Sequence, residues 1–395
     1  MTGKEVYAAS NVISEVTGKG AYLNIALKKA PEKAVRMLVY GVMEKYYLLN
    51  YIADELCDKL KNNLRPYMLV GLYCVVNKVA PLPVIVKTVT EALSEGGKGA
   101  VKGFFTAVLS KADRAEYSLP APGKKGYEEV RFNLPSWLVG MYKKEYPDRY
   151  EQIIDNSEKH RVHIVAYCDE KEVFSADPSA EKTLAGYFVH NGEEMGKLFS
   201  AGEITYMSLG SALVCEAAGD VKGKTTLDCC AAPGGKAVYL AKKGALVTAC
   251  DVYPHRLELI RAYAKRMNAE ISVIEQNGTE RREDYVGAFD VVLCDVPCSG
   301  LGVIDKKRDI VINRTYEDIL ALSELQKKIL NNCCAYVKKG GVVVYSTCTV
   351  FSKENGDVTA EFLKGHNDFT KEEERQYLPD GKGMEGFYVC RMRRN

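Results

Sequence analysis

The chain contains 395 residues, of which 47% are hydrophobic and 27% are charged, and its formal net charge at pH 7 is +2. This length fits two or three folded domains, and the composition excludes wholesale disorder. The charge is uneven, because residues 1–115 carry 16 Lys and Arg against 10 Asp and Glu, and the remainder carries 38 against 42. A basic end on a near-neutral body is compatible with a module that binds a polyanion, and equally with a solvated helical face.

The cysteine count and the apolar runs indicate the compartment. There are 13 cysteines, and the first ten residues lack the apolar core of a signal peptide. The longest apolar runs, such as residues 68–76, are too short to cross a bilayer. We therefore expect a cytoplasmic protein without membrane contact, in which most thiols act as small core hydrophobes. No Cys-x-x-Cys pair or histidine cluster has metal-ligand spacing, so we expect no metal.

Residues 1–116 have helical periodicity and few strand signals, which predicts an all-helical domain. Within it, Leu38, Val42, Tyr46 and Leu49 recur at the spacing of one helix face. Residues 117–220 begin with a stretch rich in Pro, Gly and Lys, and we interpret them as a linker with a small mixed α+β subdomain.

Residues 221–395 alternate between apolar strands and amphipathic helices, which predicts a parallel sheet with helices on both faces. The predicted strands cover residues 225–229, 245–250, 271–275, 289–294 and 342–345, and the predicted helices cover 236–242, 254–267 and 315–337. Thr315 and Asp318 have the spacing of a capping box, and Gly340-Gly341 is expected to end the last helix. A final strand over 386–391 is expected to be antiparallel. The predicted fold class is therefore α/β.

A glycine-containing turn follows the first predicted strand of this α/β part. Gly234 and Gly235 allow close approach of backbone to a ligand, and Asp251, at the end of the second strand, is placed to accept hydrogen bonds from ribose hydroxyls. A tight strand-to-helix turn with a helix cap explains the same residues. A nicotinamide dinucleotide is compatible with both features, but the fuller glycine fingerprint is missing, which favours a cofactor without phosphates.

Two cysteines follow two of the predicted parallel strands. Cys298 comes after the strand 289–294, and Cys348 comes after the strand 342–345. Because ligands bind outside the carboxyl ends of parallel strands, we expect both thiols to reach one crevice. A thiolate there could add to an electron-poor ring, and Asp295 could hydrogen-bond to or protonate a ring nitrogen. Packing as a buried hydrophobe, the usual role of a free cysteine, fits these strand-end positions poorly.

These residues resemble a known family. The segments 230–236, Asp295-Val296-Pro297-Cys298-Ser299-Gly300 and Tyr345-Ser346-Thr347-Cys348-Thr349 are similar to motifs I, IV and VI of the RNA 5-methylcytosine methyltransferases. The helical N-terminal part resembles the antitermination factor NusB, and this combination looks like the RsmB subfamily, which modifies small-subunit ribosomal RNA. The resemblance implies a Rossmann-like methyltransferase domain over 221–395, S-adenosyl-L-methionine as cofactor, RNA as partner and a monomer.

The resemblance also implies a role for each matching residue. Cys348 is the expected nucleophile toward carbon 6 of cytosine, Cys298 is expected to help release the product, and Asp295 is expected to face both cytosine and cofactor. The expected cofactor-binding residues are Cys230, Ala231, Ala232, Pro233, Gly234, Gly235, Lys236, Asp251, Asn277 and Asp295.

Departures from the family pattern leave alternatives open. The carboxylate that the family places after the third strand is missing, and we expect Asn277 or Thr279 to replace it. One alternative is a non-catalytic RNA-binding factor with a vestigial methyltransferase domain, against which the joint presence of Cys298, Cys348 and Asp295 argues. Another is a DNA cytosine methyltransferase, which needs the same chemistry after base flipping.

Overall fold

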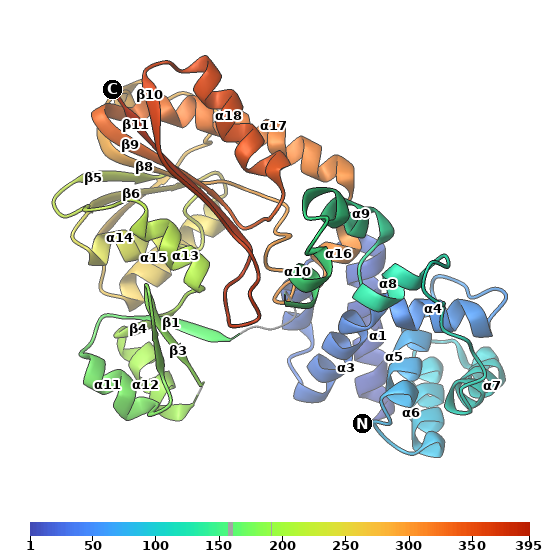
Figure 1. Ribbon diagram of the computed structural model, residues 1–395. Coiled ribbons are helices and arrows are strands. Elements are labelled where there is room, and N and C mark those ends of the chain that lie inside the picture. The colour runs from blue at the N-terminus through green and yellow to red at the C-terminus, as the bar shows by residue number, and fades with distance from the viewer. Residues whose placement is uncertain (157–160, 191) are drawn as a thin grey trace. The chain divides into compact units, whose positions relative to one another are not determined.

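The structure is a computed structural model that describes residues 1–156, 161–190 and 192–395 (Figure 1). The chain forms two compact units. The first contains residues 1–148 and 306–314, and the second contains residues 149–305 and 315–395. The nine residues 306–314 therefore interrupt the second unit and belong to the first. They come after the segment that carries Cys298.

The first unit is all-helical, as the sequence predicts. Its helices are α1 (Gly3–Lys19), α2 (Leu23–Ala26), η1 (Leu27–Lys29), α3 (Lys33–Glu44), α4 (Tyr46–Leu56), α5 (Arg65–Val76), α6 (Leu82–Glu95), η2 (Gly99–Val101), α7 (Lys102–Asp113), α8 (Tyr127–Phe132), α9 (Ser136–Glu145) and α16 (Ile310–Asn313). The prediction that residues from Leu38 to Leu49 share the face of one helix is wrong, because α3 ends and α4 begins on either side of Lys45. The periodicity continues across the break because both helices bury apolar residues in the same core.

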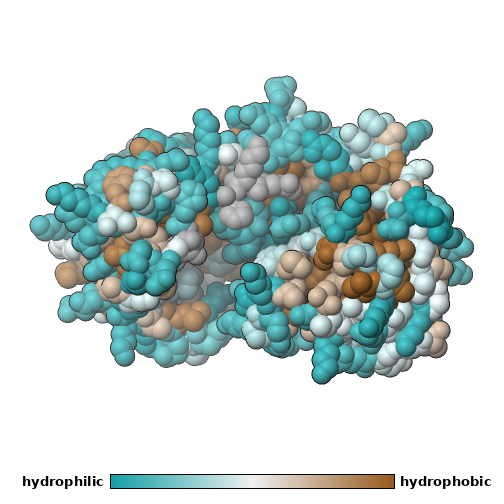
Figure 2. All heavy atoms as spheres, turned by 90° about the horizontal axis from the view of Figure 1, so that it is seen from below, coloured by the Kyte–Doolittle hydropathy of each residue, from teal (hydrophilic) through white to brown (hydrophobic). Residues whose placement is uncertain are grey.

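The surface of the helical unit is not uniformly polar. Tyr22 and Ile25 around α2 and Met37 and Tyr40 on α3 are exposed large apolar side chains. Figure 2 shows apolar atoms gathered among polar ones on part of this unit, at the right of that view. The helical unit therefore offers exposed apolar side chains among its polar ones.

The second unit begins with α10 (Tyr150–Asn156) and a small antiparallel sheet in the order β2-β3-β1-β4. Its elements are β1 (Val162–Ala166), α11 (Glu170–Ala176), β2 (Glu181–Thr183), β3 (Gly186–Val189), α12 (Glu193–Ala201) and β4 (Ile204–Tyr206). The described residues from 161 to 206 thus form a mixed α and β portion.

The large sheet of the second unit has the order β10-β11-β9-β8-β5-β6-β7. Its strands are β5 (Thr225–Asp228), β6 (Leu246–Asp251), β7 (Ile271–Glu275), β8 (Phe289–Asp295), β9 (Val337–Thr347), β10 (Phe369–Tyr377) and β11 (Phe387–Arg394). Strands β5 to β9 are parallel, while β10 and β11 are antiparallel. The predicted α/β fold class is confirmed, and so is the final antiparallel strand.

Helices cover both faces of this sheet (Figure 1). The helices are α13 (Leu209–Glu216), α14 (Gly235–Lys242), α15 (Pro254–Arg266), η3 (Glu283–Tyr285), α17 (Tyr316–Cys333), η4 (Cys334–Tyr336), η5 (Ser352–Glu354) and α18 (Gly356–Gly365). Within β8, Leu293 packs in the core that contains residues of α13 to α15, and the next residue, Cys294, packs with residues of α17 and α18. Both faces of the strand are buried, which explains its continuous apolar run.

One predicted boundary is wrong. We expected Gly340-Gly341 to end the long helix, but α17 ends at Cys333 and both glycines lie inside β9. Gly341 belongs there because a Cβ would lie 2.8 Å from the carbonyl oxygen of Asp290 on β8. The close approach occurs beside a register shift between the two strands, and glycine is typical of such sites.

The structure groups the predicted middle segment differently from the sequence. Residues 117–148 belong to the helical unit, and residues 149–220 belong to the unit that contains the large sheet. The division into 1–116, 117–220 and 221–395 stays a prediction about independent domains. No helix among the described residues is both long enough and apolar enough to span a membrane.

The capping box at the start of α17 gives a test of the fold. The Thr315 hydroxyl accepts from the backbone N–H of Asp318, and the Asp318 carboxylate accepts from the Thr315 N–H. Replacing Thr315 by alanine removes one cap, so we expect a loss of about 1 kcal/mol from the free energy of unfolding, measured in urea. Thr315→Ser keeps the hydroxyl and should behave like the parent. Equal losses for both variants would contradict the capping role.

Candidate active site

Two strands bring the predicted cysteines together. In the pairing of β8 with β9, Asp295 lies opposite Ser346, so the segments that follow both strands begin at the same edge of the sheet. The Sγ atoms of Cys298 and Cys348 are 3.1 Å apart, and both side chains are half-buried. The prediction that the two thiols reach one place is confirmed. The distance is far longer than a disulfide bond and corresponds to a hydrogen bond between sulfurs.

The thiol pair is asymmetric. The backbone N–H of Cys348 donates to the Cys298 sulfur at 3.3 Å. The pKa of Cys298 is raised well above its ordinary value, first because its S–H bonds to Cys348 and second because it is buried. Either sulfur can be the donor in the hydrogen bond between them, so each thiol can stabilise a negative charge on the other.

Gly302 fixes the segment that directly follows Cys298. The backbone N–H of Gly302 donates to the carbonyl of Cys348 at 2.9 Å, and the N–H of Gly386 donates to the carbonyl of Gly302 at 2.8 Å. A Cβ at position 302 would lie 2.1 Å from the carbonyl oxygen of Gly386, so only glycine fits. The segment that follows Cys298 is therefore held by hydrogen bonds to the backbone at Cys348.

Asp295 lies between a basic and a hydroxyl side chain. Its Oδ2 is 2.7 Å from the Nζ of Lys236, and its Oδ1 accepts from the Ser346 hydroxyl at 2.8 Å. Burial works against the charge of Lys236, but the carboxylate of Asp295 outweighs it, so the pKa of Lys236 is raised. An ion-paired carboxylate is an acceptor of hydrogen bonds, which favours hydrogen bonding over proton donation among the roles considered for Asp295.

The turn over residues 230–236 connects β5 to α14. The N–H of Ala231 donates to the Cys250 carbonyl at 2.8 Å, which joins the turn to β6. Gly234 has a φ of 110°, a value that L side chains rarely adopt, and a Cβ there would lie 3.1 Å from Cα of Ile260. Lys236, in the first turn of α14, makes the ion pair with Asp295. The predicted residues thus form a continuous segment, with Cys230, Ala231, Ala232, Pro233 and Gly234 in the turn and Gly235 and Lys236 at the start of α14.

Asp228 is a residue that the sequence analysis missed. It ends β5, it is 1% exposed, and neither carboxylate oxygen accepts a hydrogen bond of normal geometry from the described residues, although the N–H of Cys230 is near. Burial, and then the charge of Asp295, raise the pKa of Asp228 to about 7. Its position could have revealed it. Asp228 ends a parallel strand just before the glycine-containing turn, and ligands bind at the carboxyl ends of such strands.

Asp251 and Asn277 lie at the ends of β6 and β7. Asp251 is 5% exposed and accepts from the Tyr253 N–H at 3.2 Å. The side chain of Asn277 is used locally, because its oxygen accepts from the N–H of Thr279 at 3.1 Å and its nitrogen donates to Glu280 at 2.9 Å. With Asp228 and Asp295, the edge carries three carboxylates around one lysine. Its charge suits a cationic ligand better than a phosphate-bearing one.

Three other cysteines meet behind this edge. The Sγ atoms of Cys229, Cys294 and Cys333 lie within 4.8 Å of one another, and all three side chains are buried. Cys333 also donates to the carbonyl of Gly278 at 3.7 Å. Residue spacing does not reveal this cluster, because Cys229 directly follows β5, Cys294 lies in β8 and Cys333 ends α17. They pack as small apolar groups, and the absence of a metal stays a prediction.

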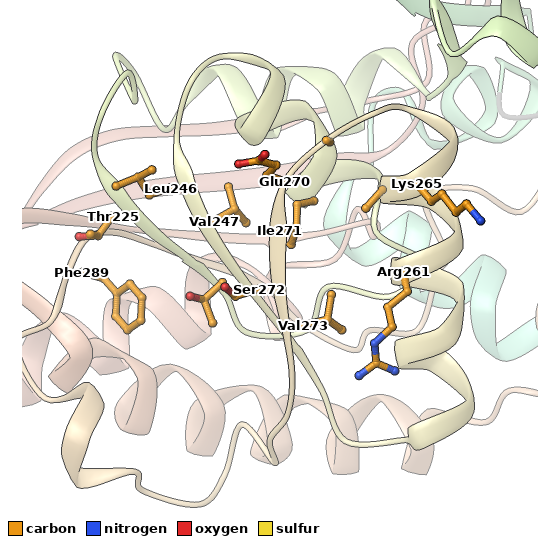
Figure 3. A pocket seen from close by; sticks show the side chains of 13 residues that line it. Thr225, Leu246, Val247, Arg261, Lys265, Glu270, Ile271, Ser272, Val273 and Phe289 are labelled. Atoms are coloured by element: carbon orange, nitrogen blue, oxygen red, sulfur yellow. The ribbon is translucent and has the colours of Figure 1, made fainter.

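A cavity of about 670 Å³ lies at the opposite end of the strands (Figure 3). It is lined by Thr225, Leu246 and Phe289 at the starts of β5, β6 and β8, by Ile271 of β7, and by Arg261 of α15. The predicted site residues lie at the carboxyl ends of these strands. The cavity is therefore not part of the candidate site, and its size says nothing about the chemistry there.

The raised pKa of Asp228 gives a stability test. Between about pH 4 and pH 7 the folded chain keeps a proton on this group that the unfolded chain has lost, so stability falls as the pH rises through this window. Asp228→Asn removes the titration. We expect the variant to gain up to a few kcal/mol relative to the parent between pH 5 and pH 8 in urea unfolding. The exposed Asp220→Asn variant is the control, and a constant difference across pH would contradict the burial of an ionisable carboxyl.

Comparison with known proteins places this geometry in a family. A family model described as 16S rRNA methyltransferase RsmB/F matches residues 219–393. The chain is 30% identical to ribosomal RNA small subunit methyltransferase B of Vibrio vulnificus, over 97% of both chains. It is 29% identical to the probable enzyme of that name from Bacillus subtilis, over 90% of this chain and 89% of that one. The solved structure of the protein PH0851 has a TM-score of 0.84 at 22% identity and covers 100% of this chain and 99% of its own, which supports the fold. The chain therefore belongs to the family of ribosomal RNA small subunit methyltransferase B.

Proposed function

We propose that this protein is an S-adenosyl-L-methionine-dependent RNA cytosine-C5 methyltransferase that acts on small-subunit ribosomal RNA. The observation that carries the proposal is the pair of sulfurs 3.1 Å apart, beside the carboxylate of Asp295. Methylation at carbon 5 of a pyrimidine needs a nucleophile at carbon 6, because carbon 5 becomes reactive only after that addition. Membership of the family supports RNA methylation as the activity.

Cys348 is the proposed nucleophile. Its thiol first loses its proton to water, the resulting thiolate forms a bond to carbon 6 of cytosine, and the electrons of the carbon 5–carbon 6 double bond make carbon 5 nucleophilic. Carbon 5 would then take the methyl group that the bound cofactor supplies. Cys298 keeps its hydrogen and directs it to the same sulfur. At the end of the cycle the proton on carbon 5 leaves to water, the double bond forms again, and the bond from carbon 6 to sulfur breaks. Cys348 leaves as a thiolate, and a hydrogen bond from the S–H of Cys298, which keeps its proton, assists release.

Asp295 is proposed to read the base. As a carboxylate fixed by Lys236 and Ser346, it accepts hydrogen bonds but does not donate them. The exocyclic amino group of cytosine is a matching donor, whereas uracil presents an acceptor at that position. This contact orients the ring with carbon 6 toward Cys348 and selects cytosine.

The carboxyl edge of the sheet fits the proposed cofactor. The turn 230–236 brings backbone close to the ligand, Asp251 is placed for ribose hydroxyls, and the buried carboxylate of Asp228 lacks a good partner. S-adenosyl-L-methionine, when bound, supplies a methyl group on a positively charged sulfonium. Asp228, Asp251 and Asp295 stabilise such positive charge, while Asn277 stays a weaker proposal because its side chain is used locally.

The helical unit is proposed to hold the RNA. Its excess of basic residues favours a polyanion, and its exposed apolar side chains allow stacking contacts with unpaired bases. The expected cytoplasmic location, monomeric state and absence of a metal remain predictions.

Replacement of each cysteine gives the main test. Cys348→Ala should lose methyl transfer by at least about 10³-fold, because no nucleophile remains. Cys298→Ala should accumulate a covalent RNA adduct that survives denaturing electrophoresis. The measurement is bisulfite sequencing of unmodified small-subunit ribosomal RNA after incubation with enzyme and cofactor, with DNA of the same sequence for comparison.

Cys168→Ala is the matched control, since this half-buried cysteine lies outside the site and should behave like the parent. Turnover by Cys348→Ala would show that another residue is the nucleophile. Preferential methylation of the DNA would favour the DNA methyltransferase alternative.

Cofactor binding separates an enzyme from a vestigial domain. Calorimetry should give binding heat with S-adenosyl-L-methionine, and Asp251→Asn should weaken the affinity by about tenfold through the loss of one charge-assisted hydrogen bond. Asp220→Asn, an exposed aspartate outside the site, should leave the affinity unchanged. If the parent chain gives no binding heat, the non-catalytic alternative is correct.

A further inference from the structure

A buried glutamate connects the segments that carry the two cysteines. Glu354 lies in η5, six residues after Cys348, and its side chain is 0% exposed. Its carboxylate accepts three hydrogen bonds: from the N–H of Ser299 at 2.8 Å, from the hydroxyl of Ser299 at 2.6 Å and from the side-chain amide of Gln326 at 3.0 Å. Ser299 directly follows Cys298, so one carboxylate near the Cys348 segment holds the Cys298 segment.

The neighbouring hydrogen bonds extend this connection to both sides of each cysteine. The amide of Gln326 also donates to the carbonyl of Pro297 at 2.9 Å, directly before Cys298. The hydroxyl of Ser299 lies 3.2 Å from that of Thr349, directly after Cys348. The backbone carbonyl of Glu354 accepts from the hydroxyl of Tyr345 at 2.6 Å, three residues before Cys348.

The chemistry of the network requires a carboxylate. Ser299 and Gln326 together present three donors to Glu354, and a carboxylate offers acceptors only. Glutamine has the same shape, but its amide nitrogen would face a donor, and a buried donor without an acceptor is costly. The network lies beside the reacting sulfurs, and no step of the proposed mechanism uses Glu354 itself.

We propose that Glu354 is a positioning residue that fixes the Cys298 thiol against the Cys348 sulfur and thereby sets the rate at which the covalent RNA intermediate is released. The proposal rests on the proposed function. In the step concerned, the carbon 5–hydrogen bond breaks and the proton leaves to water. Its electron pair restores the carbon 5–carbon 6 double bond, and the bond from carbon 6 to Cys348 breaks. The departing sulfur takes the bonding pair as a thiolate and is stabilised by a hydrogen bond from the S–H of Cys298, which keeps its proton. Glu354 touches none of these atoms and acts through Cys298.

The first experiment measures turnover by full-length Glu354→Gln with unmodified small-subunit ribosomal RNA and S-adenosyl-L-methionine. We expect kcat to fall by about tenfold or more with both KM values nearly unchanged, and a larger fraction of the enzyme to be trapped as RNA adduct. The matched control is Glu361→Gln on α18, an exposed glutamate that pairs with Lys327 and should behave like the parent. Parental turnover without adduct, or a rise in KM alone, would overturn the proposal.

A double-mutant cycle separates positioning from a general loss of structure. If Glu354 acts through Cys298, adding Glu354→Gln to Cys298→Ala should change the amount of adduct little. A change in the amount of adduct as large as the change in the parent background would show a merely structural role. Ser299→Ala removes the hydroxyl that donates to Glu354 and leaves the carboxylate and the Ser299 N–H in place. It should show the same defect at smaller size, and it is the variant to use if Glu354→Gln does not fold.

A measurement without RNA distinguishes failure of this proposal from failure of the proposed function. Alkylation of Cys298 and Cys348 by iodoacetamide, followed by mass spectrometry, reports how the thiols are held. We expect the ratio of the two rates to change by about threefold or more in Glu354→Gln and not in Glu361→Gln. An unchanged ratio would overturn the positioning role. If the parent enzyme makes no 5-methylcytosine, the proposed function fails whatever the ratio is.

Discussion

The parallel pairing of β8 with β9 is the constraint on which the site depends. It sets Asp295 opposite Ser346, and the chain then needs only three residues to reach Cys298 and two to reach Cys348. A slip of one residue in this register would turn one set of side chains to the other face of the sheet. Because both strands are buried on both faces, the register is fixed by the core, and the contact between the sulfurs is a consequence of sheet packing.

Charge organises the rest of the carboxyl edge. Lys236 neutralises Asp295 directly, and it leaves Asp228 in a buried position where repulsion from Asp295 adds to the cost of ionisation. A positively charged group at this edge would be stabilised by the carboxylates. The same ion pair fixes the orientation of the carboxylate that is proposed to face cytosine, so binding of the cofactor and reading of the base share one side chain.

Sequence reasoning reached the elements that have a strong local signal. The β7 strand begins and ends at the predicted residues 271 and 275, the cap at Thr315 is present, and Cys298 meets Cys348. Prediction from the sequence failed where a residue's role depends on a contact with a residue far away in the chain. Gly341 resembles a helix stop until the backbone of β8 is seen next to it, and the break at Lys45 is hidden because the apolar spacing continues through it. The roles of Glu354 and Asp228 depend on burial and on partners in other segments, which no spacing rule conveys.

Because residues 306–314 belong to the helical unit, this unit is built from two separate stretches of the chain. The N–H of Leu23 donates to Asp309 at 3.3 Å, and the hydroxyl of Tyr47 donates to the carbonyl of Val311 at 3.0 Å, so the segment 306–314 is an integral part of that unit. The two units therefore exchange chain at three points. Cutting after residue 148 would strand a buried apolar helix, α16, on the remaining fragment. A continuous gene segment for residues 1–148 would therefore encode the helical unit without α16.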